Sequence, residues 1–209
     1  MLARIAAFAA SLLVAGCSMF GDRSGTEEPT FDVVATVGAL EIRRYGPRLA
    51  AETTIQADEE AARNQGFRRL AGYIFGANSG KAEIAMTAPV SQQAGSEIAM
   101  TAPVSQARDA TGAWVVRFFL PRQWTMASLP RPNDPAVRLV TIPGETVAVL
   151  RFTGDRGASA VAARQAELLR ALENAPWRAE GTPYGWFYDP PWTLPWLRRN
   201  EVVVPVVGR

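Results

Sequence analysis

The sequence predicts an α+β fold in which two ββ-α-ββ units share one barrel-like core. In each unit, short extended segments interrupted by a Gly-Pro or Pro-Gly pair come before a helical pattern, and further extended segments follow it. The two expected helix starts, Asp58 and Ser159, lie 101 residues apart. A sheet covered by one helix leaves its other face open to water. We therefore expect the two units to bury these faces against each other in one domain, residues 31–209.

The first unit begins with two expected strands, residues 40–45 and 49–55. The Gly-Pro pair between them predicts a tight hairpin, because a helix does not tolerate this pair. Asp58 is the expected N-cap of a helix that ends at Gly76. Residues at helical spacing predict its apolar face: Phe67, Leu70, Ala71, Ile74 and Phe75.

A segment occurs twice, letter for letter, at residues 83–92 and 97–106. Its alternating pattern and the glycine-containing linker predict two similar strands that form a hairpin. The proline in each copy indicates a strand end or a sheet edge, because proline cannot donate to a ladder. Residues 113–120 are apolar on both faces except at Arg117, which predicts a central strand.

The second unit repeats the pattern of the first. Residues 137–142 and 146–152 flank a Pro-Gly pair and predict a second strand pair. Residues 159–174 predict a helix that begins at its own serine cap, with these residues on one face: Val161, Leu168, Leu169 and Leu172. Residues 188–197 predict a rigid loop of prolines and aromatic residues, and residues 202–207 predict the last strand.

Composition excludes several kinds of chemistry. The 209 residues include no histidine and one cysteine, Cys17. This rules out a Ser-His-Asp triad, a Cys-His pair, an HExxH zinc site, a histidine ligand to haem iron and an intramolecular disulfide. The formal net charge of +2 gives no electrostatic reason to expect nucleic acid as a partner.

The N-terminal segment is typical of a targeting signal. Residues 1–16 have a basic start and a ten-residue apolar run, which matches a secretory signal and is too short for a spanning helix of about 20 residues. Residues 13–17 resemble the lipobox of bacterial lipoproteins, which implies that Cys17 is lipidated and anchors the chain to a membrane. Ser18 after it implies the outer membrane, with the domain facing the periplasm. Residues 17–30 are expected to form a flexible tether.

Three segments resemble the SOUL haem-binding family. They are IAMTAPVS at residues 84–91 and 98–105, LPRPNDPAV at residues 129–137 and YDPPWTLPWLRRNEV at residues 188–202. The resemblance extends over about residues 31–207. It implies a distorted eight-stranded β-barrel with two helices, built from two pseudo-symmetric ββ-α-ββ repeats. The family's fold is similar to that of gyrase-inhibitor-like domains, which hold small molecules.

The resemblance also implies a function, the non-catalytic binding of haem or another tetrapyrrole in a hydrophobic groove. By position, the family's contact residues fall on Arg63, Phe67, Leu70, Ala71, Trp192 and Thr193. No metal site is identified, because a ligand to iron would have to be Met or Tyr, and a strand methionine such as Met86 more often packs in a core. A structural interpretation stays open, in which Phe67 and Leu70 seal the barrel, Arg63 is solvated and the proline-rich loop only pins the chain end.

Two other functions stay open. The first is an interaction lipoprotein of the envelope without a tetrapyrrole ligand, which would use an exposed aromatic surface at residues 186–196. The second is a small-molecule hydrolase of the related fold, with a buried Glu beside a Tyr as general acid or base. The tetrapyrrole hypothesis predicts an open apolar groove between the first helix and the loop at residues 188–197, with a cationic group at its mouth.

Overall fold

The computed structural model describes residue 23 and residues 25–94, 113–190 and 192–209. Within these ranges, a ten-stranded antiparallel sheet is accompanied by two α-helices and one short 3₁₀ helix. The strands are β1 (Phe31–Val37), β2 (Leu40–Tyr45), β3 (Arg48–Gln56), β4 (Val90–Ala94), β5 (Ala113–Phe119), β6 (Arg138–Ile142), β7 (Glu145–Phe152), β8 (Trp177–Ala179), β9 (Tyr184–Phe187) and β10 (Asn200–Gly208). The helices are α2 (Glu59–Ile74), α3 (Ala158–Leu172) and η1 (Pro195–Leu197). The predicted α+β class is confirmed, and β1, β8 and β9 are additional to the predicted strands.

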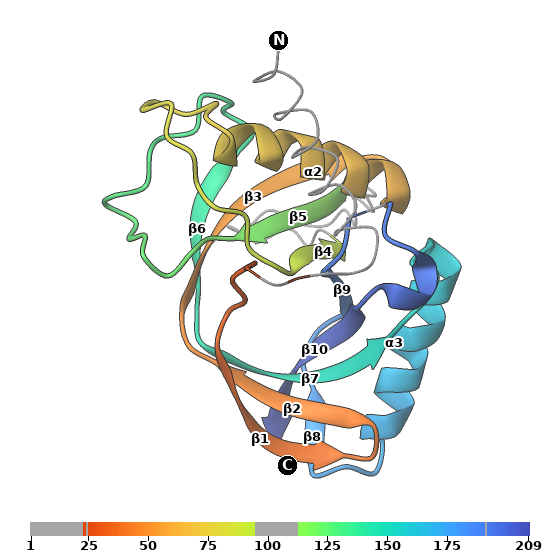
Figure 1. Cartoon of the computed structure of the whole chain (residues 1–209). Coiled ribbons are helices and arrows are strands. Elements are labelled where there is room, and N and C mark those ends of the chain that lie inside the picture. Colours follow the sequence, from red (N-terminus) through yellow and green to blue (C-terminus); the bar gives the residue numbers. More distant parts are fainter. Residues whose placement is uncertain (1–22, 24, 95–112, 191) are drawn as a thin grey trace, which may run out of the picture.

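The sheet curls into a half-barrel, with α2 packed against β3 and β5 and α3 packed against β7 and β10 (Figure 1). The strand order is β1-β2-β7-β10-β9-β4-β5-β3-β6, and β8 pairs with β10. In this order, the run β2-β7-β10-β9 lies on one side of the β9–β4 pair and the run β4-β5-β3-β6 lies on the other. Separate apolar clusters lie beneath α2 and α3, and a third, rich in aromatic residues, lies on the opposite face of the sheet, because successive residues of β5 and β7 alternate between the clusters.

The two predicted strand pairs are wrong, because the strands exchange partners between the units. β2 pairs with β7, with Tyr45 opposite Glu145, and β3 pairs with β6, with Arg48 opposite Ile142. The physical reason is the core that each strand faces. β2 buries Ile42 in the cluster beneath α3, whereas β3 contributes to the cluster beneath α2. Each short turn therefore crosses from one half of the sheet to the other.

Helix α2 begins and ends close to the predicted positions. The Asp58 carboxylate accepts a hydrogen bond of 2.8 Å from the Ala61 amide, which confirms the predicted N-cap. The helix ends at Ile74, and Gly76 follows with a φ of 104°, a conformation that favours glycine. This placement fixes which residues of α2 reach the sheet and which reach the cavity described below.

Helix α3 departs from its prediction at two points. It begins at Ala158 with Gly157 as N-cap, so the predicted Ser159 cap is wrong. The Asp155 carboxylate accepts from the Gly157 amide at 3.0 Å, which orders the turn just before the helix without a serine cap. Leu169, predicted on the buried face, is 38% exposed, because it is rotated away from the face that carries the other apolar residues. The buried residues of that face are Val161, Leu168 and Leu172, as predicted.

The repeated segment is only partly a strand. In the first copy, β4 begins at Val90, and residues before it form isolated bridges, Glu83 with Phe75 and Thr87 with Glu27. The second copy, and with it the predicted hairpin, lies outside the described residues. The prediction of a central strand at residues 113–120 is confirmed, because β5 lies between β4 and β3.

The last part of the segment predicted as a tether lies against the domain. Arg122 donates to the Glu27 carboxylate from its amide at 3.0 Å and from Nε at 3.1 Å. The Ala88 amide donates to the Glu27 carbonyl at 3.0 Å, and Arg199 pairs with Glu28 at 3.0 Å.

In the part of the chain described here, neither α-helix combines the length and apolar character that crossing a membrane requires.

Candidate ligand-binding pocket

A cavity of 420 Å³ opens between α2 and the loop that follows β9. This volume lies within the range of about 300–1,000 Å³ that is typical of small-molecule sites. The apolar part of its wall consists of Phe67, Phe75, Met86, Ala88, Val90, Phe187, Tyr188, Pro190 and Trp192. The polar part consists of Arg23, Thr26, Arg63, Asn64, Thr87, Arg156 and Asp189. The predicted apolar groove with cationic groups is therefore present between the predicted elements.

Three of the predicted site residues line this cavity. Arg63 and Phe67 lie one helical turn apart on α2, and Trp192 faces them from the loop after β9. Phe67 also contacts Phe118 of β5 in an edge-to-face arrangement, with 5.3 Å between ring centroids. This contact fixes one aromatic wall of the cavity against the sheet.

The other three predicted site residues do not line the cavity. Leu70 is completely buried in the cluster beneath α2, and Ala71 packs against the same cluster. Thr193 is also completely buried, and its carbonyl accepts from Arg198 Nε at 2.7 Å. Leu70 lies about 60° around the helix from Phe67, on the side that packs against the sheet. Leu70 is thus a core residue, as the structural interpretation had it.

Arg63 is buried, so the expectation that it is solvated is wrong. Only 8% of the residue is exposed. Its guanidinium lies 5.0 Å from the centroid of the Phe187 ring, donates to Gln92 Oε1 at 3.3 Å and lies 3.9 Å from Glu59. Burial lowers the pKa of Arg63, and the charge of Glu59 partly offsets this. The charge is therefore held at the cavity wall with little water around it.

Arg156, which sequence analysis missed, brings a second cation to the cavity. Its Nη1 donates to the Asp189 carbonyl at 2.9 Å. Its pKa is lowered from 12.5 to about 10, mainly by burial and also by the positive charges of Arg63 and Arg198. Its position in the loop before α3 carries no motif that would have pointed to it. The cavity wall therefore carries two arginines, Arg63 and Arg156, whose positive charges repel each other.

A third arginine reaches the cavity from the N-terminal segment. Arg23 Nη1 pairs with Asp189 Oδ1 at 2.6 Å, and the Asp189 side chain is only 1% exposed. The second carboxylate oxygen accepts from the Arg199 amide at 2.6 Å. Asp189 is therefore held on both sides and fixes the loop that carries Trp192 against the N-terminal segment.

Behind the cavity wall lies a buried ion network. The ring of Tyr188 lines the cavity, while its hydroxyl donates to Glu201 Oε2 at 2.6 Å. Arg43 donates twice to the Glu201 carboxylate, at 2.9 and 3.1 Å, and Arg199 donates at 3.0 Å. Burial alone raises the pKa of Glu201, but Arg43, Tyr188 and Arg199 together bring it below its ordinary value. Because Glu201 is fully buried and ionised, its carboxylate does not face the cavity as a general base.

Groups that could bind a metal are sparse around the cavity. Among the described residues, no three His, Cys, Asp or Glu side chains lie together in a way that would hold an ion. Met86 lines the cavity, whereas Met126 is 44% exposed and is not part of its wall. The Tyr188 hydroxyl is engaged by Glu201. The cavity therefore offers apolar surface and positive charge rather than a set of strong metal ligands.

Comparison with known proteins identifies the family. The family model of the SOUL heme-binding protein matches residues 26–205. Heme-binding protein 2 of Mus musculus is 39% identical over 61 residues, which are 29% of this chain and 30% of the mouse protein. Heme-binding protein 2 of Homo sapiens is 42% identical over 55 residues, 26% of this chain and 27% of the human protein. The chain thus spans about 30% of the length of these curated relatives.

Solved structures share the fold at low identity. The EcmrR C-terminal domain has a TM-score of 0.58 at 11% identity, covering 81% of this chain and 98% of that domain. A hydrolase from Listeria innocua has a TM-score of 0.52 at 12% identity, covering 83% of this chain and 94% of the hydrolase. Because the family model extends over residues 26–205, nearly the whole described domain, the chain belongs to the SOUL haem-binding protein family.

Proposed function

We propose that this protein binds haem or a related tetrapyrrole in the cavity between α2 and the loop after β9, without catalysing a reaction. The observation that carries the proposal is an apolar, aromatic-lined cavity of 420 Å³ with the two guanidinium groups of Arg63 and Arg156 in its wall. A tetrapyrrole such as haem is a flat apolar ring with carboxylates on one edge. The apolar wall of this cavity matches the ring, and the two arginines match the carboxylates. Membership in a family named for haem binding agrees with this assignment.

The residues present fit such a ligand. Phe67, Met86 and Trp192 offer apolar surface to the macrocycle, and Arg63 and Arg156 offer charge-assisted hydrogen bonds to carboxylates. When haem is bound, it supplies a redox-active iron. The sequence contains no histidine, so binding would rest on apolar packing and carboxylate pairing rather than on an imidazole ligand.

The test compares haemin with iron-free protoporphyrin on the full chain in detergent solution. We expect both to bind with one-to-one stoichiometry and with dissociation constants within about tenfold of each other, a difference of about 1.4 kcal/mol. Haemin binding is followed by its Soret band and porphyrin binding by its fluorescence. Absence of saturable binding for both ligands would contradict the proposal. Haemin binding with no porphyrin binding would contradict the account of recognition without a strong iron ligand.

We also propose that the protein is a bacterial envelope lipoprotein, anchored through acyl chains on Cys17 to the outer membrane and facing the periplasm. The support is the signal-like segment at residues 1–16 and the lipobox-like sequence that ends at this cysteine. Metabolic labelling with palmitate in a bacterial host tests it. Label that is present in the intact chain and lost in Cys17→Ser is the expected result, and equal labelling of both would contradict it.

A further inference from the structure

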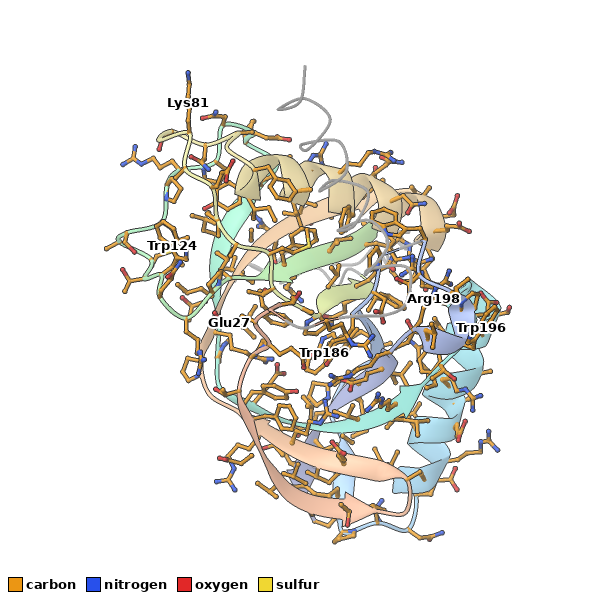
Figure 2. The ribbon with its side chains drawn as sticks, viewed as in Figure 1. Glu27, Lys81, Trp124, Trp186, Trp196 and Arg198 are labelled. Atoms are coloured by element: carbon orange, nitrogen blue, oxygen red, sulfur yellow. The ribbon has the colours of Figure 1, made fainter. Side chains whose placement is uncertain are left out.

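Two of the three most exposed aromatic residues of the described domain line the cavity. Phe75 is 64% exposed and Trp192 is 58% exposed, and both line the cavity. Trp196 is 67% exposed and lies on η1, four residues after Trp192 in the same loop. Trp186, which was predicted as part of this surface, is buried. Figure 2 shows Trp196 near Arg198 at the edge of the molecule, and Trp124 on the opposite side.

The N-terminal segment reaches the domain at the same place. Arg23 and Thr26 line the cavity, and Arg23 is paired with Asp189 of the loop that carries Trp192. Arg23 lies six residues after Cys17. Six residues span at most about 20 Å even when fully extended. An acyl chain on Cys17 would therefore keep the mouth of the cavity within about 20 Å of the membrane surface.

Exposed tryptophan close to a lipid anchor favours contact with the membrane surface. Indole rings prefer the interface between lipid headgroups and acyl chains, because the ring is apolar while its N–H remains near water. Phe75 and Trp192 are exposed and line the cavity, and Trp196 lies four residues farther along the same loop, so a surface that covers Phe75 and Trp192 also covers the entrance. A lipid bilayer meets both conditions, the apolar contact and the short distance from the anchor.

We propose that the mouth of the cavity faces the bilayer, with Phe75, Trp192 and Trp196 at the lipid interface, so that an amphiphilic ligand passes directly between the membrane and the cavity. The proposal rests on the proposed lipid anchor at Cys17 and extends it from attachment to orientation. The partner is the bilayer surface. The ligand class is a membrane-partitioning molecule with an apolar body and an anionic end, which matches the cavity wall and its arginines.

The experiment places the full lipidated chain in phosphatidylcholine liposomes whose acyl chains carry bromine, which quenches tryptophan at short range. We expect lower emission in brominated than in unbrominated liposomes. The Trp192→Phe/Trp196→Phe variant should lose more than half of this bromine-dependent quenching. Trp124→Phe, on the opposite side of the molecule, is the matched control and should keep it.

Each failure has its own signature. Protein that floats with the liposomes but shows no bromine-dependent quenching, or equal quenching in both variants, overturns the orientation and leaves the anchor standing. Protein that does not float with the liposomes contradicts the anchor and the orientation together. Haemin binding in detergent is measured separately, so its loss is distinguished from both.

Discussion

Arg63 lies near enough to Arg156 for its positive charge to lower the pKa of the second guanidinium. Both side chains line one apolar cavity, and burial acts on each in the same direction. Placing two like charges in a poorly solvated wall is unfavourable, and the nearby carboxylates of Glu59, Glu60 and Asp189 offset only part of this cost. A ligand with carboxylates relieves this repulsion, which gives a physical reason for expecting an anionic amphiphile here.

The pKa of Arg156 predicts a pH dependence of binding. Its pKa is lowered to about 10, so the side chain is charged at neutral pH and loses its proton as the pH rises through about 10. We expect the affinity for a porphyrin dicarboxylate to fall above that pH, by at most about tenfold per pH unit because one proton is linked. Fluorescence titrations of the intact chain and of Arg156→Gln measure this. An equal fall in both would show that Arg156 is not responsible.

Glu201→Gln tests the ion network behind the cavity. The change leaves Arg43 and Arg199 without their buried anion, so we expect a loss of about 3–5 kcal/mol in the free energy of unfolding at pH 7. Because the pKa of Glu201 is lowered in the folded state, its contribution is present above the ordinary value of 4.5 and is lost as the pH falls through the folded value. Urea denaturation at neutral and acid pH should show the difference between the two proteins shrinking.

The control for this change is Glu180→Gln. Glu180 pairs with Arg178 on the surface, where both side chains are about half exposed. Such pairs contribute about 0–1 kcal/mol, so its removal should change stability little. Equal losses in the two variants would contradict the special role of Glu201.

The four buried tyrosines should not ionise in the folded protein near pH 10, the ordinary pKa of tyrosine. Burial raises the pKa of Tyr45 and Tyr73 from 10.0 to about 12 and raises those of Tyr184 and Tyr188 as well. These are all four tyrosines of the chain. The near-ultraviolet tyrosinate absorbance of the folded protein should therefore stay low up to about pH 11. Ionisation of even one tyrosine near pH 10, with the circular dichroism of the fold intact, would contradict the burial described here.

The same shifts have a consequence for stability. Unfolded tyrosines lose their protons near pH 10, before the folded ones do. The unfolded state then binds fewer protons than the folded state, so stability decreases as the pH rises above 10. Unfolding and tyrosinate formation should occur together at alkaline pH.

Two glycines of α2 form a matched pair. A Cβ on Gly66 would lie 2.6 Å from Val116 Cγ2, whereas a Cβ on Gly72 meets nothing within 4 Å. Gly66→Ala should therefore destabilise the fold by about 1–3 kcal/mol through overpacking against β5. Gly72→Ala should stabilise it by about 0.5–1 kcal/mol, because alanine favours the helix. Thermal unfolding of both variants measures this, and shifts in the same direction would contradict the close approach of α2 to the sheet.

Local sequence patterns predicted both α-helices and most of the strands of this fold, but not which strands pair. The Asp58 cap and the strand at residues 113–120 follow from short-range rules, and both are confirmed. Strand pairing is decided at long range. The turns after Tyr45 and after Ile142 carry hairpin-like residues, yet the adjoining strands bury their apolar faces in different clusters and exchange partners.

Only some of the residues at the cavity could be predicted, because the others are defined by contacts with distant parts of the chain. The family resemblance, carried over position by position, named Arg63 and Phe67, which line the cavity, together with Leu70, which is buried in the core. Arg156 and Glu201 had no local signal, because the neighbours that define their roles come from distant parts of the chain. Tertiary contacts, rather than motifs, make these two residues significant.

The most direct test of the central claim is a haemin titration of the full chain and three variants, followed by the Soret band. Phe67→Ala and Arg63→Ala each remove a group from the cavity wall, and we predict dissociation constants at least about tenfold weaker, or about 1.4 kcal/mol. Leu70→Ala on the same helix should lower stability by about 2–5 kcal/mol as a core truncation while leaving haemin affinity unchanged. Equal affinity in all four proteins, or a loss confined to Leu70→Ala, would contradict the assignment of this cavity as the tetrapyrrole site.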